Sequence, residues 1–156
     1  MSEVELVLVN DTDKCTIYTI QFSEESESEY ERFYSKFIKD AQLSQDLLRI
    51  VQLLDKIADE GALERFFRPE GKMRDSVGAL PVLLSKLRLH CLRLSDKILV
   101  LGNGGVKNSR THEEDDSLRG YVMTLQKFEE LLKESQRDGT VTITSKTIES
   151  DKTFKL

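Results

Sequence analysis

The spacing of apolar residues changes several times along the chain, and each change marks a predicted structural element. Residues 4–9 and 16–22 are rich in β-branched and aromatic residues, and the polar cluster 10–14 separates them. Two such runs joined by a polar turn predict a β-hairpin over residues 4–22. From Tyr30 to Ile38 the apolar residues recur at intervals of three and four, which predicts an amphipathic helix.

A second helix is expected between Ser44 and Gly61. Serine is a favourable N-cap and glycine commonly follows the last helical residue. One face of this helix carries the apolar residues Leu47, Leu48, Val51, Leu54, Ile57 and Ala58. With a short helical turn over 63–67, the helical part of the chain covers residues 29–67, and its two long helices should be antiparallel.

The central part of the chain, residues 77–107, has the composition of strands. Residues 77–80 indicate a short strand or turn, and residues 87–94 and 98–101 flank a Ser-Asp-Lys turn. A hairpin is the simplest interpretation. The second strand, Ile-Leu-Val-Leu, has no polar alternation, so it should lie inside a sheet with both faces covered. The glycines that follow, at 102, 104 and 105, favour a tight exit from the strand.

Ser117 is a suitable N-cap for a third helix, predicted over 117–137, and a further strand is expected over 140–148. Residues 151–156 should fray. The predicted fold class is therefore α+β. We expect a single domain over residues 1–150, in which a small antiparallel-rich sheet packs against an N-terminal helix pair and a C-terminal helix.

Length and composition limit the possible protein classes. The chain has 156 residues, enough for one core, and no apolar run approaches the roughly 18–20 residues of a membrane helix. The acidic N-terminus lacks the basic and apolar regions of a secretory signal. A cytoplasmic protein that does not bind membranes is expected, with Cys15 and Cys91 reduced and buried.

The charge is unevenly distributed. The net charge of −5 argues against non-specific binding to phosphates. Residues 72–112, however, contain eight cations and two anions, a local net charge of +6, whereas the rest of the chain carries −11. The cations of this basic segment are Lys72, Arg74, Lys86, Arg88, Arg93, Lys97, Lys107 and Arg110.

The basic segment also carries a family resemblance. Residues 86–111 read KLRLHCLRLSDKILVLGNGGVKNSRT. This stretch resembles the HigB type of the RelE/HigB superfamily of bacterial type II toxins, in which a strand with Leu-Arg is followed by a Leu/Val/Ile-rich strand and then Gly-x-x-Lys. Here Leu87-Arg88, residues 98–101, and Gly104 with Lys107 match these elements. The predicted order of elements over residues 29–139 is similar too.

The resemblance implies a toxin that cleaves mRNA without a metal or other cofactor, usually on the ribosome, and that is neutralised by a helix-turn-helix antitoxin. In such a reaction the ribose 2′-OH is deprotonated and attacks the adjacent phosphate. Three features depart from the pattern: the net charge is negative, the chain is extended at both ends, and the acidic run 113–116 stands where further cations would be expected.

The chemistry selects candidate residues within the segment. Metal-free RNA cleavage needs a base, a cation for the charged phosphorane and an acid. Arg88 and His90 are two positions apart on a predicted strand, so they should share the face opposite Leu87, Leu89 and Cys91. The candidate catalytic residues are Arg88, His90 and Lys107, and the candidate RNA- or partner-binding residues are Lys86, Arg93, Arg110, Lys72 and Arg74.

The same residues allow other interpretations. Alternating cations can simply solvate the outer face of a sheet, and the glycine run lacks the Lys-Ser/Thr of a phosphate-binding loop. No metal site is predicted, because no Cys/His cluster has zinc-ligand spacing. The alternative function is a catalytically inactive RelE-like protein-binding module, either regulatory or antitoxin-like.

Overall fold

The computed structural model describes residues 2–69, 76–81, 85–107, 112–150 and 153–156. Its elements, in chain order, are β1 (Glu3–Asp11), β2 (Thr16–Phe22), α1 (Glu29–Phe37), α2 (Ser44–Glu60), the 3₁₀ turn η1 (Glu64–Phe66), β3 (Arg68–Pro69), β4 (Val77–Leu80), β5 (Leu87–Ser95), β6 (Ile98–Val106), α3 (His112–Arg137), β7 (Thr142–Ile143), β8 (Ile148–Glu149) and β9 (Phe154–Lys155).

A seven-stranded mixed sheet in the order β3-β4-β5-β6-β2-β1-β9 forms the centre of the molecule. Neighbouring strands are antiparallel except β2 and β6, which run parallel over four residue pairs from Thr16↔Ile98 to Thr19↔Leu101. The predicted α+β class is confirmed, but the sheet is larger than the small one predicted. It is larger because the β2–β6 pairing joins the N-terminal hairpin to the central hairpin in one sheet.

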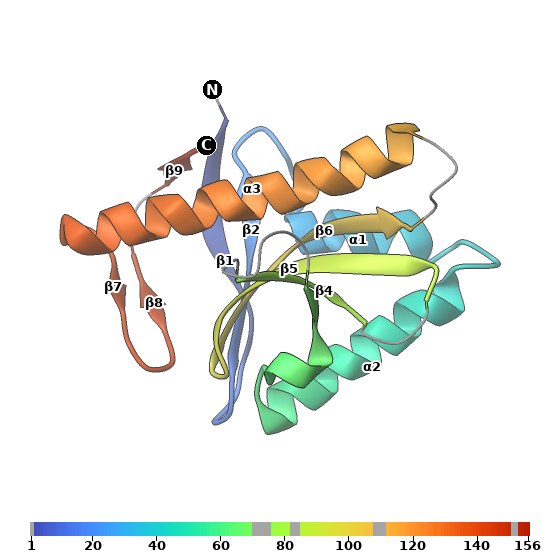
Figure 1. The fold of residues 1–156 in the computed structure, drawn as a ribbon, viewed down its shortest axis with the longest axis horizontal. Helices are drawn as coiled ribbons and strands as arrows, with labels where there is room; N and C mark the ends of the chain where they lie inside the picture. The colour runs from blue at the N-terminus through green and yellow to red at the C-terminus, as the bar shows by residue number, and fades with distance from the viewer. Residues whose placement is uncertain (1, 70–75, 82–84, 108–111, 151–152) are drawn as a thin grey trace.

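Helices cover both faces of the sheet (Figure 1). On one face α1 and α2 bury Phe33, Leu47 and Ile57 against β5 and β6. On the other face the long α3 crosses the strands and buries Leu125 and Phe128. In the described part of the chain no helix is both long and apolar enough to span a membrane.

Local sequence explains where α1 begins. Ser28 accepts a hydrogen bond from the Glu31 backbone N–H at 3.2 Å, and the Glu31 carboxylate accepts one from the Ser28 N–H at 3.0 Å. This capping box satisfies two helix-end donors. Acidic residues in the first turn, Glu29 and Glu31, suit the positive end of the helix dipole.

α2 ends before Gly61, whose φ of 106° suits glycine.

The C-terminal part differs from the prediction in three ways. α3 begins at His112 rather than at residue 117, and within this added part Asp116 pairs with Arg119 one turn further along at 3.3 Å. Residues 140–148 hold the short hairpin β7–β8 rather than one strand. The tail, predicted to fray, forms β9 and pairs with β1, because the Phe154 ring is only 2% exposed and packs edge-on against Phe128 at 5.0 Å.

The glycine run of β6 does not leave the sheet as predicted. The strand continues to Val106, and its register with β5 shifts between Leu101 and Gly104, so that Gly102 and Asn103 together oppose His90. This is a β-bulge. A Cβ on Gly104 would lie 1.9 Å from the Arg88 carbonyl oxygen, so a side chain there would force the two strands apart.

Two glycine-to-alanine substitutions test this packing. Gly104→Ala is expected to lower the free energy of unfolding by about 3 kcal/mol or more, because its methyl group overlaps the β5 backbone. The control, Gly120→Ala, lies within α3 with nothing within 4 Å of the added Cβ, and should stabilise by about 0.5–1 kcal/mol. Denaturant unfolding measures both, and equal effects would contradict the register of β6.

Candidate functional site

The three predicted catalytic residues come from β5 and the end of β6. Leu87, Leu89 and Cys91 belong to the core on the α1–α2 side, so Arg88 and His90, which alternate with them, face the α3 side of the sheet. Lys107 follows β6, and its backbone N–H donates to the Lys86 carbonyl at 2.7 Å. The β5–β6 pairing therefore brings Lys107 next to the strand that carries Arg88 and His90.

His90 is the most unusual residue of this group. Its side chain is 2% exposed, and within the described residues neither ring nitrogen has a hydrogen-bond partner. Burial, together with the positive charges of Lys107 and Arg88, lowers the pKa of His90 from 6.5 to about 4. The imidazole is therefore neutral at pH 7. A buried side chain whose polar atoms lack hydrogen-bond partners is unusual in a folded protein, and a catalytic role would explain it.

Arg88 is also buried, with 3% exposure. Its guanidinium donates hydrogen bonds to the Ser85 carbonyl at 2.7 Å and to the Leu87 carbonyl at 3.0 Å. These contacts fix the positive charge close to the start of β5. After burial and the charge of Lys107, this charge also contributes to the lowered pKa of His90.

Among the other predicted cations that the structure describes, Lys86 is exposed and Arg93 is paired. Lys86 and Lys107 are exposed, whereas Arg93 donates to the Ala62 carbonyl at 2.6 Å and pairs with Asp96 and with Glu64, the latter at 3.7 Å. Arg93 therefore fastens the end of β5 to the segment that follows α2. Lys72, Arg74 and Arg110 lie outside the described residues.

The arrangement supplies part of the chemistry of RNA cleavage. A neutral imidazole can accept the 2′-OH proton, and two adjacent cations can stabilise a charged phosphorane. Lys107 is the member of the group that solvent reaches, so a phosphate can meet it directly. His90 is reached only if a covering segment moves. Within the described residues no group of three or more His, Cys, Asp and Glu side chains could hold a metal ion.

Sequence reasoning did not single out a second group of polar residues, which lies between α1 and α3. Arg32 and Lys36 of α1, Asn103 of β6 and Tyr121 of α3 line a cavity of about 300 Å³ there. Arg32 and Lys36 occupy the polar face of an amphipathic helix, and Tyr121 fits the apolar stripe of α3, so none of them stands out in the sequence. The only available signal was that Arg32 and Lys36 are four residues apart, which places them on one helix face.

Comparisons of the chain with protein-family models, curated proteins and solved structures found no match.

The burial of His90 predicts a pH dependence of stability. Because its pKa is about 4 in the folded protein and near 6.5 when unfolded, the unfolded chain binds more protons between these values. Stability should therefore fall as the pH drops from about 6.5 through 4. Relative to His90→Gln, wild type should lose on the order of 3 kcal/mol across this window. Denaturant unfolding at pH 7 and pH 4 measures the difference, and parallel curves would contradict the burial of His90.

Proposed function

We propose that this protein is a toxin of the RelE/HigB type that cleaves mRNA without a metal, acting at the ribosome and neutralised by a helix-turn-helix antitoxin. The observation that supports the proposal is that the positive charges of Lys107 and Arg88 both act on the buried imidazole of His90, which is neutral at pH 7. Action on ribosomes implies a cytoplasmic location. The α+β architecture, with a helix pair on one face and a helix on the other, is compatible with the resemblance seen in the sequence.

The proposed roles follow from protonation and exposure. His90, neutral at pH 7, takes the proton of the ribose 2′-OH as the 2′-oxygen bonds to phosphorus, and returns it to the 5′-oxygen as the P–O5′ bond breaks. Lys107 binds the scissile phosphate as an exposed point charge, and Arg88 adds a fixed positive charge behind it. Because His90 is 2% exposed, RNA must displace part of the covering structure before cleavage.

The burial of Arg88 and His90 also favours a second candidate function. In a protein-binding module that does not cleave RNA, these two residues would serve packing and strand geometry, as Arg93 does through Asp96 and Ala62. The partner would still be an antitoxin-like or regulatory protein. Under this alternative, only exposed residues such as Lys86 and Lys107 would contribute to the interaction.

Induced expression in bacteria separates the two functions. Wild type should arrest growth and produce new mRNA 5′ ends on ribosomes, and Lys107→Ala should reduce cleavage about 100-fold, because one charge-stabilising group is lost. Lys97→Ala is the matched control, since Lys97 is exposed at the opposite end of the same hairpin. Cleavage unchanged in Lys107→Ala would contradict the assigned site. Normal growth with intact mRNA would contradict the toxin function and favour the binding module.

A further inference from the structure

The cavity between α1 and α3 lies where two parallel strands separate. β2 and β6 pair only as far as Thr19 and Leu101, and β6 then continues without β2 to Val106. The chain leaves β2 into α1 on one face of the sheet and leaves β6 into α3 on the other face (Figure 1). Connections that leave adjacent parallel strands toward opposite faces open a crevice at their carboxyl ends, and ligands bind in such crevices.

The walls of this crevice are polar and come from distant parts of the chain. The cavity of about 300 Å³ is lined by Glu27, Arg32, Ser35, Lys36, Asn103 and Tyr121. A second cavity of about 230 Å³ shares Lys36 and Tyr121 and extends along Gly104 and Gly105 to the start of α3. Together they have the dimensions of a small-molecule site.

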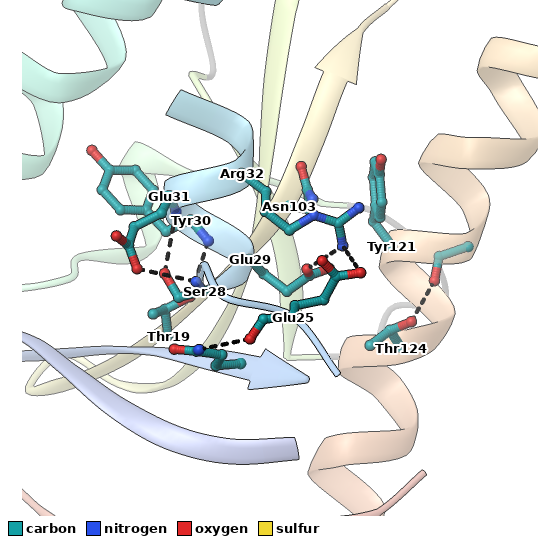
Figure 2. A network of polar contacts seen from close by, with 12 residues as sticks. Thr19, Glu25, Ser28, Glu29, Tyr30, Glu31, Arg32, Asn103, Tyr121 and Thr124 are labelled. Carbon is teal, nitrogen blue, oxygen red and sulfur yellow. Dashed lines mark hydrogen bonds and ion pairs between the residues drawn. The ribbon is translucent and has the colours of Figure 1, made fainter. Parts of the chain in front are cut away.

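Figure 2 shows how the charges in the crevice are distributed. Glu29 is 4% exposed, and its carboxylate accepts a hydrogen bond from Arg32 at 3.0 Å. Glu25 lies 3.9 Å from the same guanidinium. Arg32 is therefore already in ion pairs with two carboxylates, and the Glu29 carboxylate is hydrogen-bonded to it.

Lys36 is held differently from Arg32. Its amine donates to two uncharged oxygens, the Gly104 carbonyl at 2.8 Å and the Tyr121 hydroxyl at 3.2 Å. The same amine lies 5.1 Å from the centre of the Tyr121 ring. Partial burial of the amine and the neighbouring Arg32 lower the pKa of Lys36 to about 8, while the charge of Glu29 acts in the opposite direction. An ammonium group held by neutral partners gains more from an anion than one that is already in an ion pair.

We propose that the crevice between α1 and α3 binds a small phosphorylated ligand of nucleotide size, with its phosphate on Lys36. The Tyr121 hydroxyl and the Asn103 side chain provide further polar contacts. Asn103 is 2% exposed, and its carbonyl oxygen already accepts the Gly104 N–H at 2.8 Å, which orients its amide nitrogen as a donor. The uncharged remainder of the ligand faces Ser35 and Glu27, whose side chains offer hydrogen-bond partners for hydroxyl groups.

A phosphate fits this site better than a carboxylate. It brings up to two negative charges and three acceptor oxygens, enough for Lys36, Tyr121 and Asn103 to bind at once. The crevice lies at the β2 edge of β6, beside α1, and Lys36 contacts the β6 backbone at Gly104. The ligand site is therefore separate from the proposed role of His90, and it does not depend on RNA cleavage.

The test compares adenosine 5′-monophosphate, inorganic phosphate and adenosine by calorimetry and ligand-observed NMR. The two phosphates should bind, and adenosine should bind at least 10-fold more weakly than its monophosphate. Lys36→Gln should weaken binding of the monophosphate at least 10-fold, and Tyr121→Phe about 3-fold, because each loses a phosphate contact. Lys39→Gln is the matched control: Lys39 is exposed just beyond α1 and loses the same charge.

The pH dependence gives a further readout. The groups that face the Lys36 amine are Arg32 and Glu29 from α1 and Tyr121 from α3, and β6 presents a backbone carbonyl. Arg32 stays charged, and burial raises the pKa of Tyr121, so neither changes between pH 7 and 9. Affinity for adenosine 5′-monophosphate, a phosphomonoester with a second pKa near 6, should fall over this range as Lys36 loses its proton.

Several results would overturn the proposal. One is equal binding of adenosine and its monophosphate, and another is equal affinity of Lys36→Gln and Lys39→Gln. Absence of phosphate binding up to about 10 mM, where the binding free energy is only about 3 kcal/mol, would also overturn it. If Lys36→Gln fails to fold, as judged by circular dichroism, the Tyr121→Phe result decides.

Discussion

A single buried threonine links β2, β6 and α1 at the point where the two parallel strands separate. The Thr19 hydroxyl is in a side chain that is 1% exposed, and it donates to the Leu101 carbonyl at 2.7 Å while it accepts the Tyr30 backbone N–H at 3.2 Å. One hydroxyl thus satisfies the last carbonyl of the parallel pairing and a free N–H in the first turn of α1. Unpaired, each group would cost about 1–3 kcal/mol.

This junction lies beside the crevice between α1 and α3. Because α1 is fastened at Tyr30, its side chains Arg32 and Lys36 line the crevice that opens beyond Leu101. On its other edge β6 pairs along its whole length with β5, which carries Arg88 and His90. The proposed ligand crevice and the proposed RNA site therefore lie on either side of one strand. The two sites meet at the bulge formed by Gly102 and Asn103. Asn103 lines the crevice, and in the strand pairing it lies opposite His90.

The sequence predicted what is encoded locally. The three-and-four spacing of residues 30–38 predicted α1, and the runs around Ser95, Asp96 and Lys97 predicted the β5–β6 hairpin, because both depend on near neighbours. Strand alternation likewise placed Arg88 and His90 opposite Leu87 and Leu89. These features can be derived without knowing which segments meet.

Features that depend on distant segments could not be derived. Nothing in residues 16–19 or 98–101 specifies that they pair with each other in parallel, and that pairing creates the crevice. The burial of His90 depends on what packs over the α3 side of the sheet, which strand alternation does not determine. Similarly, the C-terminal tail looks polar, and the core contact between Phe154 and Phe128 joins segments that lie far apart in the sequence.

The most direct test of this account is native-state hydrogen exchange on Thr19→Val, with Thr124→Val as the control. Valine preserves the shape of threonine but removes the hydroxyl, and the Thr124 hydroxyl in α3 donates to the Gly120 carbonyl of its own helix at 2.9 Å. The account predicts faster exchange of the Tyr30 amide in Thr19→Val and a loss of about 1–3 kcal/mol in unfolding free energy. Unchanged protection of Tyr30, with a stability equal to that of Thr124→Val, would contradict it.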